Sequence, residues 1–270
     1  MSDAAPELPT LTESDLAPAD VLLWRGRDWA DRLIPRLDRG RYADAGVYDG
    51  QRVIVCGRCG VERRPPFPAD VYRFHHDGRP LGRYGLSAQA VLAGADAYLA
   101  AGPEHRGTSE YLLGLLLIMR RTGHSRLRRL SVEAAGTPLL SALRRTIGHV
   151  YPAGTTALTG SELVTELFGA AGRRSGLPYH ILSAPAARHP RGAWPPTSGR
   201  YEHLMQEIEE LLTRAKPDLP VAVSRARATA PGGHQPVAAG GPLAPACLVT
   251  PGDLEHSPSL IRIGRLRILR

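Results

Sequence analysis

The stretch "ALTGSELVTELF", residues 157–168, gives the clearest indication of how the second half of the chain begins to fold. Small and polar residues precede an apolar helical face, so the stretch predicts the entry of an amphipathic helix. Gly160 is acceptable as the N-cap, and Ser161 and Glu162 suit the first turn. We therefore expect a helix with Gly160 as its N-cap.

The first third of the chain carries the strongest β signals. Two β-rich runs, 45–48 and 53–56, flank Asp49-Gly50, a dipeptide suited to a primed hairpin turn. The runs "ADVLLWRG" (19–26) and "ADVYRFHHDG" (69–78) predict two further strands. Between these signals, "RDWADRLIPRLDRG" (27–40) has the spacing of a short helix that Pro35 would kink or end.

The pattern then becomes helical and later returns to β. We expect helices at 87–101, 108–121, 126–148 and 201–215, a strand within "SGLPYHILS" (175–183), and β character again in 246–269. Strands that cluster early and late, with helices between them, predict an α+β class. The expected architecture is a mostly antiparallel sheet packed by a helical layer.

Composition shifts suggest one domain with flexible attachments. Residues 1–17 are acidic and polar, and we expect a disordered or loosely docked arm there. Residues 18–270 are then a single domain. Stretches near 184–199 and 216–246 are rich in Pro and Gly, and they are expected to be loops.

The chain is basic, and its basic residues are almost all arginine. The formal net charge is +8, and Lys216 is the only lysine among 34 basic residues. Such a charge could attract nucleic acid or an acidic surface. The densest cluster, "RLRRL" (126–130), instead has the pattern of the wet side of an amphipathic helix. No nucleic-acid-binding signature accompanies it, so nucleic acid is an unlikely partner.

Leader, membrane-span and cysteine patterns in the sequence indicate the cellular compartment. The N-terminal residues have no basic and apolar leader pattern. The longest apolar run, "YLLGLLLIM" (111–119), is shorter than the roughly 20 residues of a membrane span. Three cysteines do not suggest a disulfide framework. We expect a soluble, cytoplasmic protein.

Four parts of the chain occur in an order typical of a known enzyme family. They are "ADAGVY" (43–48), "VIVC" (53–56), "GSELV" (160–164) and the closing "VTPGDLEHSPSLIRIGRL" (249–266). In this order the chain resembles the permuted papain-like cysteine hydrolases of the NlpC type, near relatives of the lecithin:retinol acyltransferase-like enzymes. The resemblance spans roughly 18–269 and implies a permuted papain-like fold.

The resemblance also implies a catalytic triad, and this sequence departs from it at every position. Gly160 stands where the family has its cysteine nucleophile, Asp44 where it has the histidine base, and Cys56 where it has the third residue. A carboxylate with a pKa of about 4 is a poor proton acceptor for a thiol with a pKa of about 8.5. The inherited mechanism is therefore expected to be lost.

Two alternative nucleophiles remain to be weighed. Cys56 could lie across the same cleft beside Asp44, with the backbone N–H groups at Gly160 forming an oxyanion site. A raised pKa in a dry cleft could make Asp44 the general base. Ser161 is a weaker candidate, because it would point away from that cleft. Histidine bases are available at His105, His124, His149 and His180, and the sequence cannot place them.

Metal and redox chemistry find little support. Cys56 and Cys59 form a CxxC motif, with His75 and His76 further along. A zinc site needs four well-placed ligands, and a redox CxxC normally opens a helix. We therefore expect no metal and no cofactor.

The favoured interpretation is a catalytically degenerate papain-like protein with a retained cleft. The cleft would bind a small-molecule or peptide-like ligand, or serve a partner enzyme, and its expected lining is Tyr42, Asp44, Cys56, Gly160 and Ser161. Asp44 suits an amine or hydroxyl group, and the Gly160 helix start suits an anionic or carbonyl group. The alternative is an active acyl-transfer, amide-hydrolysing or cyclising enzyme rebuilt around Asp44 and Cys56.

Overall fold

The computed structural model describes residues 8–26, 34–36, 40–57, 60–76, 78–81, 87–100, 159–177, 179, 181 and 249–268. Its first strands and single-turn helix are β1 (Thr10–Leu11), η1 (Glu13–Asp15), β2 (Val21–Trp24), β3 (Asp44–Tyr48), β4 (Val53–Gly57) and β5 (Gly60–Arg64). They are followed by β6 (Ala69–His76), β7 (Arg79–Pro80), α2 (Ala88–Leu92), α3 (Ala95–Ala100), α7 (Gly160–Ser175), α11 (Pro251–Glu255) and β8 (Leu260–Leu266).

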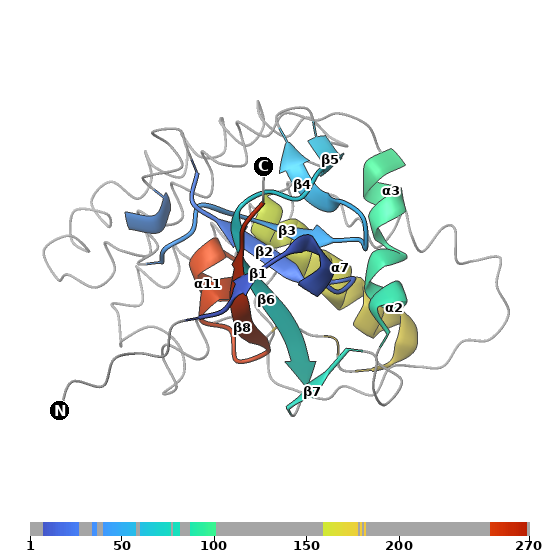
Figure 1. The fold of residues 1–270 in the computed structure, drawn as a ribbon. Helices are drawn as coiled ribbons and strands as arrows, with labels where there is room; N and C mark the ends of the chain where they lie inside the picture. The colour runs from blue at the N-terminus through green and yellow to red at the C-terminus, as the bar shows by residue number, and fades with distance from the viewer. Residues whose placement is uncertain are drawn as a thin grey trace, which may run out of the picture.

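Within the described residues, one eight-stranded sheet carries the fold (Figure 1). Its order is β1-β8-β6-β2-β3-β4-β5, with β7 paired to β6. β1 runs parallel to β8, and the other pairings are antiparallel. The expected α+β class with a mostly antiparallel sheet is confirmed at this level.

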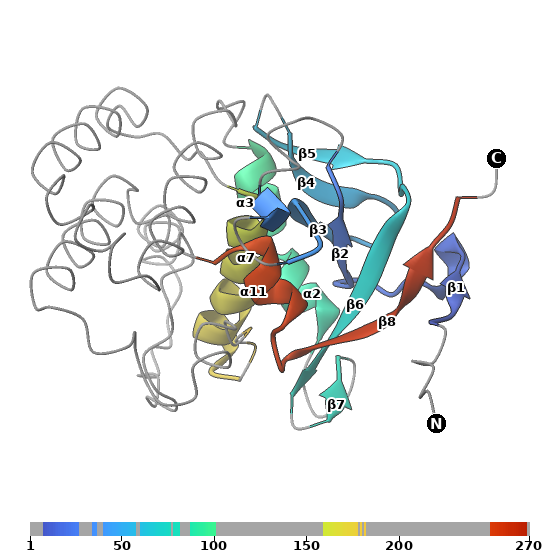
Figure 2. The same cartoon turned by 90° about the vertical axis from the view of Figure 1, so that its left-hand side faces the viewer.

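The helices cover one face of the sheet (Figure 2). Alternate residues of β2, β3 and β4, such as Leu23, Ala45 and Ile54, point to that face and pack with Leu163 and Leu167 of α7. All five are fully buried. This alternation is what a strand with one face on a helical layer requires.

The opposite face is covered partly by the N-terminal segment. The intervening strand residues, among them Leu22, Val55 and Val71, form a second cluster against which Leu11 and Leu16 pack. Thr10 pairs with Arg265 of β8. Part of the segment expected to be an arm is therefore docked on the sheet.

The predicted β3–β4 hairpin is confirmed, with its turn shifted by one residue. Tyr48 pairs with Val53, and the N–H of Asp49 donates to the carbonyl of Arg52. This places Gly50 and Gln51 at the centre of the turn. Gly50 has a φ of 107°, a conformation that favours glycine.

Two local predictions need correction. The helix expected over 87–101 is two short helices, α2 and α3, which are separated by a turn at Ala93-Gly94. In the stretch predicted as a strand at 175–183, Ser175 ends α7, Gly176 takes the left-handed conformation, and Tyr179 and Ile181 lie outside any strand. Glycine at this position terminates a helix and redirects the chain.

Several predictions lie outside the described residues. These are most of the helix at 27–40, the helices at 108–121, 126–148 and 201–215, and the loops near 184–199 and 216–246. No helix among the described residues is long and apolar enough to cross a membrane.

Candidate functional site

The start of α7 lies directly against the start of β3. Thr159, not Gly160, is the N-cap: its hydroxyl accepts from the N–H of Glu162, and the Glu162 carboxylate accepts from the N–H of Thr159. This reciprocal pair is a capping box, and it fixes where the helix begins. Gly160 is consequently the first helical residue.

Gly160 has no space for a side chain. A Cβ atom added there would lie 2.1 Å from the carbonyl oxygen of Ala45 and 2.2 Å from Oδ1 of Asp44. Backbone of β3 supplies the closer contact, so a rotamer change elsewhere cannot relieve it. The structure thus brings Asp44 and Gly160 together, in a junction with no room for a nucleophile on Gly160.

Asp44 is engaged inside this junction. Its side chain is buried, and Oδ1 accepts a hydrogen bond of 2.8 Å from the N–H of Ala45. A carboxylate at the N-terminus of a helix is also favoured by the helix dipole. These contacts give Asp44 a structural role at the β3–α7 junction.

Ser161 joins α7 to the C-terminal segment. Its buried hydroxyl donates to the carbonyl of Val249 over 2.8 Å. The next residue, Thr250, caps α11 and forms a second capping box with Asp253. The hydroxyl of Ser161 is therefore used to hold two helix starts together.

Cys56 lies in the apolar core between the sheet and the helices. Its relative exposure is 3%, and it belongs to the cluster that contains Ala45, Leu163 and Tyr98. Burial raises the pKa of Tyr98, and the nearby carboxylates of Glu166 and Glu162 raise it further. A substrate carbonyl could reach the sulfur only if this packing opened.

The hydroxyl group of Tyr42 is engaged by Asp70 and Tyr72. Its hydroxyl donates to Oδ2 of Asp70 and accepts from the hydroxyl of Tyr72 over 3.2 Å. Burial, together with the hydrogen bond to Asp70, raises the pKa of Tyr42. Tyr42 is only 1% exposed, so it faces the protein interior.

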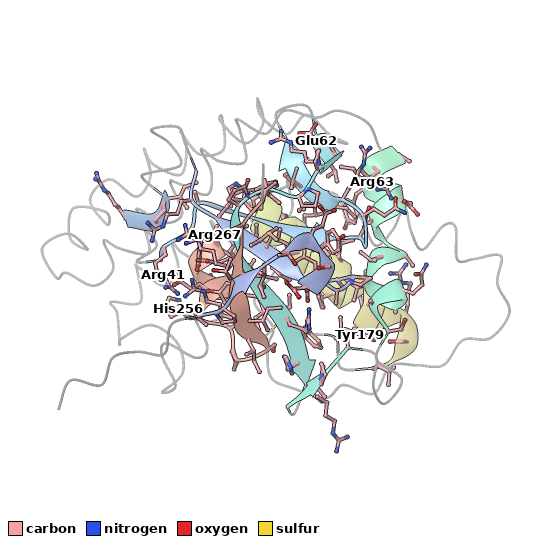
Figure 3. The ribbon with its side chains drawn as sticks, viewed as in Figure 1. Arg41, Glu62, Arg63, Tyr179, His256 and Arg267 are labelled. Atoms are coloured by element: carbon pink, nitrogen blue, oxygen red, sulfur yellow. The ribbon has the colours of Figure 1, made fainter. Side chains whose placement is uncertain are left out.

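A polar cluster that the sequence analysis did not identify continues from Tyr42 along β6 and β8. Asp70 faces Nη2 of Arg262 at 2.9 Å and Nε of Arg265 at 3.9 Å. Close by, Arg41, which is labelled in Figure 3, pairs with Glu255 at the end of α11. In the sequence, this cluster is indicated only by arginines within a predicted strand. Such arginines are equally typical of a strand edge exposed to solvent.

The metal and base candidates are only partly described. Cys59, His105, His124, His149 and His180 lie outside the described residues. His75 is half-buried, with Nδ1 3.0 Å from the carbonyl oxygen of Arg73. No group of three or more potential metal ligands occurs in the described part of the chain.

A scan against protein-family models found no match, and searches of curated proteins and of solved structures found none either. The papain-like resemblance therefore stays a prediction based on the order of motifs.

Proposed function

We propose that this chain is a catalytically degenerate papain-like protein of the NlpC type. It binds a small-molecule or peptide-like ligand, or a partner enzyme, and does not work as an ordinary cysteine hydrolase. The observation that carries the proposal is the packing at Gly160, where an added Cβ would lie 2.1 Å from the Ala45 carbonyl oxygen.

The placement of Asp44 supports the assignment of these positions. The resemblance pairs the base position with the nucleophile position, and the side chain of Asp44 does lie next to Gly160. Asp44 and Gly160 are 116 positions apart in the chain. Their contact is what we expect if the chain kept the family's arrangement of base and nucleophile positions but lost the catalytic side chains.

The alternative, an enzyme rebuilt around Asp44 and Cys56, finds less support. Cys56 is 3% exposed among apolar side chains, whereas a reactive cysteine needs access and a polar environment that stabilises its thiolate. Oδ1 of Asp44 accepts from Ala45. That hydrogen bond gives Asp44 Oδ1 a structural partner in the backbone of β3.

Thiol labelling of the full-length protein separates the two functions. The folded protein is treated with a limiting amount of iodoacetamide at several pH values from 5 to 8, using about one equivalent per thiol, and the modified cysteine is identified by peptide mass. A parallel sample receives p-nitrophenyl acetate, and its intact mass is measured for an acyl adduct. Cys56→Ser is the matched control.

We expect Cys56 to stay unmodified until urea unfolds the protein, and we expect no acyl adduct at that residue. Fast alkylation of folded Cys56 below pH 8, or an acyl group on Cys56 that turns over, would instead establish the rebuilt enzyme. The binding part is tested with alanyl-alanine amide as a peptide-like probe, by NMR titration of wild type and Asp44→Asn. A saturable shift supports the retained cleft, and its absence over the millimolar range counts against a peptide-like ligand.

A further inference from the structure

A β-bulge in β8 determines which side chains share the face of Asp70. Val71 pairs with Gly264, whereas the next residue, Tyr72, pairs with Arg262, so Ile263 is an extra residue in β8. In a regular strand, residues three apart point to opposite faces. The bulge instead places both Arg262 and Arg265 opposite residues of a single face, because their partners Tyr72 and Asp70 are two apart.

The bulge thus directs two guanidinium groups toward one carboxylate. Arg262 Nη2 lies 2.9 Å from Asp70 Oδ1, and Arg265 Nε lies 3.9 Å from the same oxygen. The other oxygen, Oδ2, accepts from Tyr42. Asp70 can neutralise one arginine, and the pair therefore keeps an excess positive charge.

Both arginines carry N–H donors that no described residue uses in a hydrogen bond. Within the described residues, Nε of Arg262 is buried and has no hydrogen-bond partner. The side chain of Arg265 is 62% exposed, and its Nε lies 3.9 Å from Oδ1 of Asp70, which is beyond hydrogen-bond distance. A guanidinium group offers five N–H donors in a fixed plane, and here most of them are not used by Asp70.

The described residues around the two arginines hold this arrangement and leave an excess positive charge on it. Burial raises the pKa of Tyr42 and of Tyr72, so both hydroxyl groups stay neutral at physiological pH. The nearby carboxylate of Glu255 forms an ion pair with a third arginine, Arg41, whose backbone N–H also donates to it. Arg41 itself is half-exposed at the border of the cluster.

We propose that Arg262 and Arg265 form a binding site for an oxyanion, namely a phosphate or carboxylate group of a ligand. Such a group presents two or more oxygens in the geometry that the planar fork of arginine matches, and it supplies the missing negative charge. Asp70 and the two tyrosines act behind the arginines as positioning residues. The site lies on the β6–β8 pair, and it does not depend on the papain-like resemblance or on the Asp44–Gly160 junction.

The test is an NMR titration of the full-length protein at low salt, observing the arginine Nε–Hε signals. The two probes are phenyl phosphate and benzoate, which distinguish a phosphate from a carboxylate preference. Arg265→Gln is the principal variant, because Arg265 is exposed and its loss leaves the Arg262–Asp70 pair in place. Arg64→Gln is the matched control, since Arg64 is also half-exposed and lies on β5 at the far edge of the sheet.

We expect saturable binding of at least one probe, weakened by about tenfold or more in Arg265→Gln and unchanged in Arg64→Gln. Binding should also weaken as salt is raised. Equal affinity in wild type and Arg265→Gln would overturn the proposal, as would the absence of a saturable shift with both probes up to about 10 mM.

Discussion

The hydroxyl group of Ser161 donates a hydrogen bond to the carbonyl oxygen of Val249, a residue 88 positions further along the chain, and this bond joins the starts of two helices. Each of these helices, α7 and α11, begins with its own capping box. The capping boxes fix where each helix begins, and the Ser161 bond fixes where α11 sits on α7. This contact makes the C-terminal segment part of the core.

Replacing Ser161 with alanine should destabilise the protein by about 1–3 kcal/mol, because the buried carbonyl of Val249 loses its donor. The free energy of unfolding from urea titration measures the effect. Thr165→Ala is the control, since its hydroxyl donates to a carbonyl within the same helix, that of Ser161. If Thr165→Ala lowers the free energy of unfolding as much as Ser161→Ala does, the bond between the two helices contributes no more than a bond within one helix.

Gly160→Ala should also be destabilising, although alanine is the better helix former. The new methyl group would meet the Ala45 carbonyl oxygen and Asp44 Oδ1, and overpacking of this kind costs roughly 1–3 kcal/mol. Gly169→Ala in the same helix is the matched control. There the nearest atom is the flexible tip of Arg173, at 3.2 Å, so we expect a gain of up to about 1 kcal/mol.

The midpoint temperature of thermal unfolding should therefore fall in Gly160→Ala and rise in Gly169→Ala. A Gly160→Ala protein as stable as Gly169→Ala would mean that the β3–α7 junction has space, and the observation behind the proposed function would fail.

Gly264→Ala should detach β1 while the rest of the sheet stays folded. A Cβ at this position would lie 2.6 Å from the carbonyl oxygen of Pro9 and 2.7 Å from Cγ of Leu11. Amide hydrogen exchange should accelerate at the Arg265 and Arg267 N–H groups, which donate to Pro9 and Leu11. The amides of β3 and β4 serve as internal controls, and faster exchange there as well would indicate global rather than local loss of structure.

Asp49→Asn should lower stability near neutral pH and have less effect in acid. Oδ1 of Asp49 accepts from the N–H groups of Gln51 and Arg52 in the hairpin turn, and Oδ2 accepts from Arg63. Burial opposes ionisation, but these hydrogen bonds outweigh it, so the pKa of Asp49 is lowered from 3.8. The stabilisation is present above the unfolded-state pKa and is lost as the pH falls through the folded-state pKa.

The difference in unfolding free energy between wild type and Asp49→Asn should accordingly be about 1 kcal/mol at pH 7 and smaller below about pH 4. Asp96→Asn is the control, because Asp96 contacts the same Arg63 but is 78% exposed. Screening by water makes such an exposed pair nearly neutral. A difference for Asp49→Asn that stays constant down to pH 3 would contradict the role of its charge.

Local patterns in the sequence were enough to predict the elements that depend on them. The β3–β4 hairpin follows from two β-rich runs around Gly50, and α7 follows from its apolar face. The N-cap is Thr159, one residue before the glycine that residue type alone favours. What makes that glycine necessary is the carbonyl of Ala45, which belongs to a distant part of the chain.

The features that were missed are set by pairing between distant segments. Nothing local to Thr10 indicates that it pairs in parallel with Arg265. Likewise, the alternation of β8 alone would separate Arg262 from Arg265, and only its register on β6 reveals the bulge that unites them. The cluster around Asp70 depends on this register, so no pattern within one segment could have predicted it.

The position of β8 in the sheet has a consequence for biosynthesis. β8 is the last described strand to leave the ribosome, yet it lies between β1 and β6. Until it emerges, residues 69–74 of β6 lack the strand that pairs with them in the folded protein, and β1 lacks the strand with which it pairs. At about 5–20 residues per second, translation of the segment between β6 and β8 takes on the order of ten seconds or more. This stretch of β6 therefore waits for its partner strand throughout that interval, and an edge that lacks its partner favours aggregation or chaperone binding.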